Sequence, residues 1–200
     1  MQEVYLHLGL QKTATTLFQL EIFPKLQGIY FYNKPKIKRV LEEPIAGDKI
    51  LLSEEGWSHT FTPRGKLPAP SEIDYEFSLL GKLHARFPRA KIILGIREKE
   101  SWVKSLFSRF YLETQDDDFE KFRTEINPKF LNQFRYIRQI LLLFDEVFIY
   151  DYDNFLSNKQ KVIENMCAFM GVSVPIDIDT DKRYNVSLFS WEKGRCKRRN

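Results

Sequence analysis

The stretch of the chain that decides its fold is Leu6-His7-Leu8-Gly9-Leu10-Gln11-Lys12-Thr13-Ala14-Thr15-Thr16-Leu17. A short apolar run of strand type leads into a glycine, a lysine and a group of hydroxyl side chains, and an amphipathic helical pattern follows. The backbone N–H groups at the start of a helix lack partners within the helix and carry the positive end of its dipole. The stretch therefore predicts a strand, an anion-binding loop and a helix in succession, with Lys12 supplying a full positive charge.

The rest of the chain repeats this alternation of short apolar runs and longer amphipathic segments. Strand-like runs occupy residues 4–8, 28–32, 49–53, 90–96 and 146–150, and helical patterns occupy residues 15–23, 71–87, 101–111, 129–144 and 158–170. Residues 35–48 and the proline-rich residues 62–70 follow neither period, and we predict that they are irregular. The order indicates an α/β fold of the three-layer P-loop type, in which a mostly parallel central sheet lies between helices. Ligands of such sheets bind beyond the carboxyl ends of the strands.

Size and composition limit the class of protein. With 200 residues, of which 43% are hydrophobic, the chain is expected to form a single domain that spans residues 1–200. The net charge of +4 is densest in the tail at residues 193–199, and because such tails are usually solvated we expect no nucleic-acid partner. Cys167 and Cys196 match no metal-ligand spacing, so neither a metal site nor a disulfide framework is predicted. No run approaches the ~20 apolar residues of a membrane span and no signal-peptide pattern opens the chain, so we expect a cytoplasmic protein.

The loop at residues 9–16 resembles the 5′-phosphosulfate-binding loop of the sulfotransferases that depend on 3′-phosphoadenosine 5′-phosphosulfate (PAPS), which reads approximately G-x-x-K-[TS]-G-T-[TS]. The chain departs from this pattern only where Ala14 replaces the usual glycine. Alanine is poorly suited to a positive φ, so we expect Ala14 to adopt a helix-compatible backbone conformation. The G-x-x-x-x-G-K-[ST] pattern of nucleotide triphosphatases is not satisfied, because no glycine directly precedes Lys12.

A second match lies in the apolar run at residues 92–96 and in the helix predicted after it. The family places an arginine at the end of a buried strand and a serine eight residues later, and here Arg97 and Ser105 have that spacing. A guanidinium group at a strand end and a hydroxyl in the first turns of the next helix can converge on one phosphate. The resemblance implies that Arg97 and Ser105 bind the 3′-phosphate of the nucleotide.

Weaker matches extend the resemblance towards the carboxyl terminus. Residues 147–155 look like the family's strand that ends in a Y-E-D-L-type element, and residues 169–172 are similar to its F-L-G-L helix end. Residues 183–187 resemble an N-x-S-like segment that approaches the cofactor in several bacterial members, which implies a cofactor contact for Asn185. The basic residues 193–195 are a candidate lid over the nucleotide.

The resemblance implies an enzyme that transfers a sulfuryl group from PAPS to a hydroxyl or amine of a carbohydrate or small-metabolite acceptor. The cofactor-binding residues that it implies are Gly9, Gln11, Lys12, Thr13, Ala14, Thr15, Thr16, Arg97, Ser105 and Asn185. Lys12 is implied to be catalytic, because family members assign this lysine to the charge that develops on the oxygen between sulfur and phosphorus. Sulfuryl transfer resembles phosphoryl transfer in depending mostly on positioning and charge stabilisation, and no metal is expected.

An acceptor hydroxyl must also lose its proton, which requires a base near the carboxyl edge of the sheet. Glu54 and Glu55 follow the apolar run at residues 49–53, where carbohydrate-modifying members of the family carry a catalytic glutamate. We expect Glu54 to be the base because it follows the strand directly, while Glu55 faces the other way if the strand geometry persists. Glu55 and His59 are the alternatives, and both acids could instead cap the strand end. His7, within an apolar run, is expected to be a packed core residue.

Two other functions remain open at the level of the sequence. The first is a P-loop kinase or nucleotide hydrolase in which Asp151 holds magnesium, and the lack of a glycine before Lys12 argues against it. The second is a noncatalytic nucleotide-binding module of the same fold. The presence of Lys12, Arg97, Ser105 and a glutamate at a strand end argues against that module.

Overall fold

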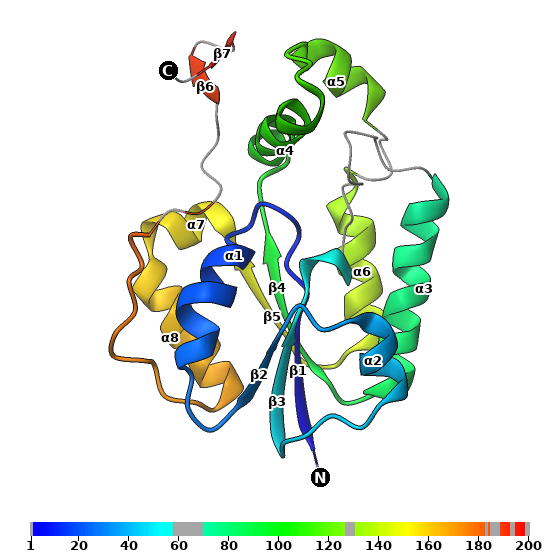
Figure 1. The fold of residues 1–200 in the computed structure, drawn as a ribbon, viewed down its shortest axis with the longest axis vertical. Helices are drawn as coiled ribbons and strands as arrows, with labels where there is room; N and C mark the ends of the chain where they lie inside the picture. The colour runs from blue at the N-terminus through cyan, green and yellow to red at the C-terminus, as the bar shows by residue number, and fades with distance from the viewer. Residues whose placement is uncertain are drawn as a thin grey trace.

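The computed structural model describes residues 2–57, 70–126, 131–182, 184, 189–192 and 195–198. Its centre is a sheet of five strands, all parallel, in the order β2-β3-β1-β4-β5 (Figure 1). The strands are β1 (Glu3–His7), β2 (Tyr30–Asn33), β3 (Lys49–Ser53), β4 (Lys91–Ile96) and β5 (Val147–Asp151). Each coincides with a strand-like run of the sequence, so the prediction of a parallel sheet is confirmed.

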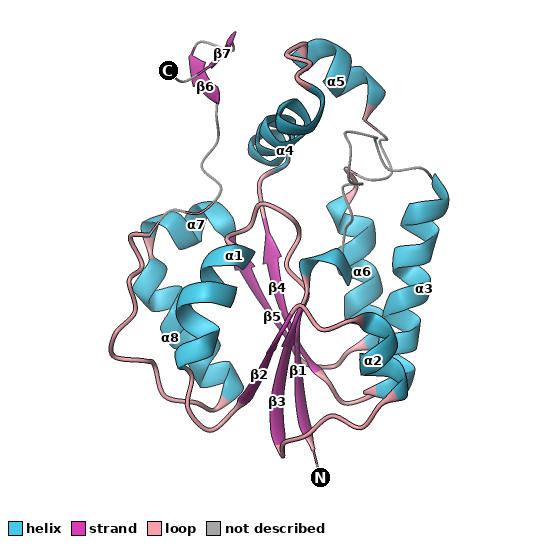
Figure 2. Ribbon diagram, in the orientation of Figure 1, coloured by secondary structure: helices cyan, strands magenta, loops and turns pink. Residues whose placement is uncertain are grey.

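Helices cover both faces of the sheet, as Figure 2 shows, which confirms the predicted three-layer α/β fold. One face carries α1 (Thr15–Leu17), its continuation through the π-helical turn η1 (Phe18–Ile22) and the 3₁₀ turn η2 (Phe23–Lys25), and α8 (Lys159–Met170). The other face carries α2 (Ile37–Glu42), α3 (Pro70–Arg86) and α6 (Gln133–Leu143). Among the described residues, no helix combines the length and apolar character that a membrane crossing requires.

The central strand β1 shows why the sheet needs a layer on each side. Val4 and Leu6 pack into the core beneath α3 and α6, whereas Tyr5 packs into the core beneath α8. Successive side chains of a strand point to opposite faces, so a strand buried on both faces reads as a continuous apolar run. The chain runs from β1 to β2 and β3 on one side and then crosses to β4 and β5 on the other. The carboxyl ends of β1 and β4 therefore flank the point where ligands bind in such sheets.

Several short elements differ from the sequence-based expectations. The interval at residues 35–48 was predicted to be irregular, but it contains α2, a helix of six residues that buries only Val40. Helices α5 (Phe119–Glu125) and α7 (Tyr152–Ser157), and the antiparallel hairpin of β6 (Phe189–Glu192) with β7 (Arg195–Arg198), were not predicted. Elements this short carry too few turns for a hydrophobic period to stand out. A separate cluster of buried residues, which includes Phe107, Phe110 and Phe122, joins α5 to α4 (Lys99–Thr114).

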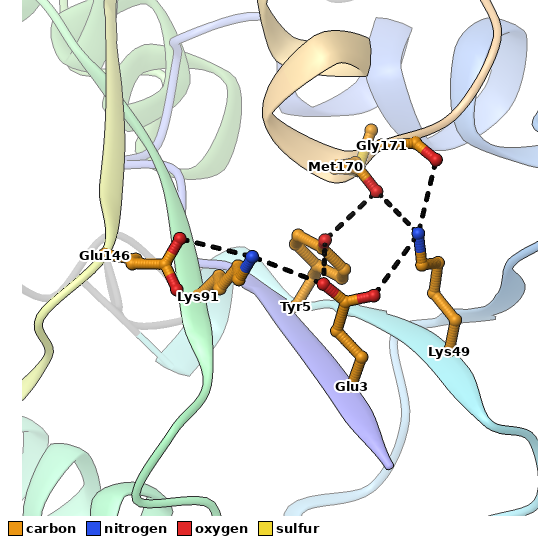
Figure 3. Close-up of polar contacts among 7 residues, drawn as sticks. All are labelled: Glu3, Tyr5, Lys49, Lys91, Glu146, Met170 and Gly171. Carbon is orange, nitrogen blue, oxygen red and sulfur yellow. Dashed lines mark hydrogen bonds and ion pairs between the residues drawn. The ribbon is translucent and has the colours of Figure 1, made fainter. Parts of the chain in front are cut away.

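Charged side chains join the amino ends of the strands (Figure 3). The Glu3 carboxylate pairs with Lys49 at 3.2 Å and with Lys91 at 3.3 Å, and Lys91 also pairs with Glu146 at 3.2 Å. Lys49 Nζ donates to the carbonyl oxygen of Met170 at 2.9 Å, so a cation lies at the carboxyl end of α8, where the helix dipole favours it. This network stabilises the edge of the sheet opposite to the candidate site.

Candidate active site

The loop between β1 and α1 has a backbone conformation that its sequence does not favour. Lys12 has φ 68° and Ala14 has φ 67°, both in the left-handed region. The expectation that Ala14 would be helix-compatible is therefore wrong: the chain keeps the turn for which the family uses glycine. The left-handed conformation costs a residue with a Cβ about 1–2 kcal/mol, so contacts elsewhere must hold the loop in this shape.

The side chains of the loop pack closely against one another and against Glu55. A Cβ added to Gly9 would lie 2.8 Å from Thr15 Oγ1 and 3.2 Å from Thr13 Oγ1, so only glycine fits beneath these two side chains. Thr13 Oγ1 donates to the carbonyl oxygen of Leu10. Thr15 Oγ1, in contrast, is buried without a hydrogen bond of normal geometry to any described group, although it lies beside the Glu55 carboxylate.

Arg97 connects the end of β4 to the loop. One terminal nitrogen of its guanidinium group donates to the carbonyl oxygen of Lys12 at 3.0 Å, and Nε donates to Ser101 Oγ at 2.9 Å. The guanidinium carbon also lies 4.3 Å from the centre of the Tyr152 ring, a cation–π contact. Ser101 and Tyr152 were missed by the sequence analysis, although Tyr152 lies in the segment that resembles the family's Y-E-D-L-type element.

The two cations of the site disfavour each other. Burial lowers the pKa of Lys12, and the charge of Arg97 lowers it further, while Glu55 opposes both effects. Burial also lowers the pKa of Arg97. Desolvated cations close together cost free energy, which a bound anion would reduce.

The two glutamates that follow β3 have different surroundings. Glu54 Oε1 accepts a hydrogen bond from the backbone N–H of Gly56 at 2.9 Å, so this carboxylate caps the 3₁₀ turn η3 (Glu55–Trp57). Burial raises the pKa of Glu55 and the Glu54 charge raises it further, whereas Lys34, Lys12 and the Thr15 hydroxyl lower it. Because η3 begins directly after the strand, the alternation of a strand does not extend to these residues. The charge of Lys12 thus acts on the Glu55 carboxylate.

The remaining predicted residues are brought together only in part. Gln11 and Thr16 lie within the loop and at the start of α1, beside Lys12, and are half-buried. Ser105 is buried on α4, one helical turn beyond Ser101, and none of the described contacts joins it to Arg97. His59, Asn185, Lys193 and Gly194 lie outside the described residues.

His7 lies beneath the loop and is fully buried, in line with its predicted place in the core. Its Nδ1 is 2.7 Å from Ser53 Oγ, which also accepts from Gln19 Nε2 at 3.0 Å, and its Nε2 is 3.5 Å from the Tyr150 hydroxyl. Burial lowers the pKa of His7 to about 3, so the ring is neutral. We therefore assign His7 a structural role beneath the loop.

A cavity of about 440 Å³ opens beside Arg97 at the carboxyl ends of β4 and β5. Its walls include Ile96, Lys99, Gln133, Phe134 and Asp151. Gln133 is 8% exposed and its Nε2 has no hydrogen-bond partner among the described residues, whereas Phe134 is 84% exposed. The volume of the cavity lies within the range of small-molecule sites. Within the described part of the chain, no three His, Cys, Asp or Glu side chains gather as metal ligands.

The strand order, the loop after β1 and the arginine at the end of β4 define a P-loop-type α/β fold. No protein-family model matches the chain, and neither does any curated protein. Solved structures do match it, and the three described here are sulfotransferases, so the fold that the sequence resemblance implied is confirmed.

A sulfotransferase from Alicyclobacillus acidocaldarius is 14% identical with a TM-score of 0.60, over 90% of this chain and 88% of that one. The sulfotransferase domain of the Synechococcus PCC 7002 olefin synthase is 15% identical with a TM-score of 0.56, over 90% and 81%. A mouse sulfotransferase solved in complex with PAP (3′-phosphoadenosine 5′-phosphate) is 12% identical with a TM-score of 0.52, over 86% and 59%. At these identities the similarity shows the fold alone.

Proposed function

We propose that this chain transfers a sulfuryl group from PAPS to a hydroxyl or amine of an acceptor. The observation that carries the proposal is the approach of Arg97 to Lys12, which joins the two segments of the sequence that resemble sulfotransferases. The fold shared with three sulfotransferases, one of them solved with PAP, supports it. The kinase alternative has less support, because Asp151 accepts from the backbone N–H of Asn154 as the cap of α7.

The residues of the loop fit a nucleotide that carries phosphate and sulfate groups. Lys12 is desolvated and lies near the Arg97 charge, and a bound anion would offset both effects on its pKa. Gly9, Gln11, Lys12, Thr13, Ala14, Thr15 and Thr16 would hold the 5′-phosphosulfate, and Arg97, Ser105 and Asn185 the 3′-phosphate. When bound, the nucleotide supplies the activated sulfuryl group. Lys12 would stabilise the charge that develops on the departing phosphate oxygen.

We propose Glu55 as the general base in preference to Glu54. The charge of Lys12 acts on the Glu55 carboxylate, which also lies beside Thr15. Glu54, in contrast, accepts a hydrogen bond from the backbone N–H of Gly56. Burial raises the pKa of Glu55, and a raised pKa makes a carboxylate a stronger acceptor for the proton of a hydroxyl. In this role Glu55 accepts the acceptor's proton as the new bond to sulfur forms.

The cavity beside Arg97 is our proposed acceptor site. It combines an apolar wall at Ile96, the exposed ring of Phe134 and the charged side chains of Arg97 and Asp151. A ring with apolar faces and polar edges, as in a saccharide or small metabolite, would use both kinds of surface. Arg97 lines the cavity and also donates to the carbonyl oxygen of Lys12, so the cavity opens near the lysine loop.

Nucleotide binding tests the proposed function. PAP should bind the chain more tightly than ATP, because ATP lacks the 3′-phosphate to which we assign Arg97. One lost charge-assisted contact costs about 1.5–3 kcal/mol, which corresponds to roughly tenfold to a hundredfold in affinity. Isothermal titration calorimetry gives both constants, and Arg97→Gln should reduce the preference. Equal affinities for PAP and ATP would contradict the proposal.

The choice of base is tested by two neighbouring substitutions. Glu55→Gln should reduce turnover about a hundredfold or more, with PAP affinity nearly unchanged. Glu54→Gln should retain most activity and lose a modest amount of stability with its contact to Gly56. Steady-state rates of sulfate transfer from PAPS, measured over a panel of acceptors, separate these outcomes. An inactive Glu54→Gln enzyme beside an active Glu55→Gln enzyme would return the role to Glu54.

In the wild type, the rate should rise with pH through the raised pKa of Glu55. The acid limb of the profile should therefore lie above the ordinary carboxyl value of 4.5.

A further inference from the structure

Consecutive carbonyl groups of the loop are each held by a side-chain donor. Thr13 Oγ1 donates to the oxygen of Leu10, Trp102 Nε1 to that of Gln11 at 2.8 Å, Arg97 to that of Lys12 at 3.0 Å, and the Tyr150 hydroxyl to that of Thr13 at 2.9 Å. Three of these donors come from other elements: Trp102 from α4, Arg97 from the end of β4 and Tyr150 from β5. The orientation of successive peptide planes is thus set by groups outside the loop.

Holding a carbonyl also directs the N–H of the same peptide. A trans peptide is planar, and its N–H points opposite to its C=O. The N–H groups of residues 11–14 therefore turn away from the four donors. Successive backbone N–H groups in a turn with left-handed residues form an anion-binding concavity. Since Lys12 and Ala14 are both left-handed, the held carbonyls stabilise a shape that the loop sequence opposes.

Tyr150 is the donor that lies closest to the strained alanine, because its acceptor belongs to the Thr13–Ala14 peptide. The side chain is buried between β5 and the π-helical turn, with its ring 5.0 Å from that of Phe18. Burial raises the pKa of Tyr150, so its hydroxyl keeps the proton that it donates. The contact also explains Gly95 on β4: a Cβ there would lie 2.5 Å from the Tyr150 hydroxyl and 2.6 Å from Thr13 Oγ1.

We infer that Tyr150 and Trp102 are positioning residues that keep the loop in its anion-binding shape before the nucleotide arrives. The ligand class that the loop would take is the sulfo- and phospho-group pair of a nucleotide, so the inference rests on the proposed function. Neither residue needs to touch the reacting atoms. Each acts through a carbonyl oxygen of the loop.

Tyr150→Phe removes the hydroxyl and keeps the ring in the core. PAP should bind this variant about threefold to tenfold more weakly, as expected for one lost hydrogen bond. Tyr5→Phe is the matched control, because the buried Tyr5 hydroxyl lies 2.7 Å from Glu3 and 3.0 Å from the Met170 carbonyl oxygen, at the opposite edge of the sheet. The control should lose stability with PAP affinity unchanged. Equal PAP affinities of Tyr150→Phe and wild type would overturn the inference.

Two further measurements separate positioning from general stability. Adding Ala14→Gly to Tyr150→Phe should recover part of the lost PAP affinity, because glycine adopts the left-handed conformation without strain. Without any nucleotide, the backbone amide chemical shifts of residues 11–14 should change more in Tyr150→Phe than in Tyr5→Phe, as measured by NMR. Equal shifts in the two variants would refute the inference even if PAP did not bind the wild type. A failure of PAP to bind would then count against the proposed function alone.

Discussion

At the scale of single residues, Ala14 shows how a local preference is overruled. The left-handed φ of 67° opposes the preference of alanine, yet Ala14 packs against the apolar cluster beneath α8 and its neighbouring peptide is held by Tyr150. The sequence comparison identified the position as unusual but drew the wrong conformational conclusion, because the groups that hold the loop are distant in the chain. Trp102 is 91 residues from its acceptor Gln11, and Tyr150 is 137 residues from Thr13.

The strain at Ala14 leads to a prediction about stability. Ala14→Gly should raise the free energy of unfolding by about 0.5–1 kcal/mol, since the relieved left-handed penalty exceeds the extra entropy of glycine in the unfolded chain. Differential scanning calorimetry should show an increase of roughly 1–4 °C in Tm. Ala46→Gly, at an exposed alanine outside the left-handed region, should not stabilise. A lower Tm for Ala14→Gly would mean that the packing of its methyl group outweighs the strain.

At the scale of the elements, the sequence predicts the strands that are buried on both faces and the long helices, but it does not predict the conformation of the short turns. The five strands and the long helices follow from apolar runs and helical periodicity, and all five runs became strands. The π-helical turn at Phe18–Ile22 was not visible, because its residues fit an ordinary helical period equally well. Strand alternation does not bear on the choice between Glu54 and Glu55, because β3 ends at Ser53 and η3 begins at Glu55.

At the scale of the whole molecule, charge is arranged differently at the two edges of the sheet. At the amino edge, Lys49 and Lys91 share the Glu3 carboxylate, and both cations are paired in the free protein. At the carboxyl edge, burial lowers the pKa of both Lys12 and Arg97, and the Arg97 charge lowers that of Lys12 further, with Glu55 as a partial counter-charge. The first edge stabilises the fold by itself, whereas the second would gain stability from an anionic ligand. PAP should accordingly bind the folded chain and raise the Tm by the mass-action effect of that binding.

The buried His7 predicts how the stability of the whole molecule depends on pH. Its pKa is about 3 in the folded chain because of burial, against 6.5 for an ordinary histidine. Between these values the unfolded chain binds a proton that the folded chain does not, so stability falls as the pH is lowered through this window, by up to about 1.4 kcal/mol per pH unit. The lowered pKa of Glu3 acts in the same direction, but only as the pH falls through and below 4.5. Urea unfolding at pH 7.5 and pH 5.0 should therefore show a loss in the wild type that exceeds that of His7→Gln by about 2 kcal/mol. Parallel losses in the two proteins would mean that His7 is protonated in the folded state, and its place in the core would then have to be revised.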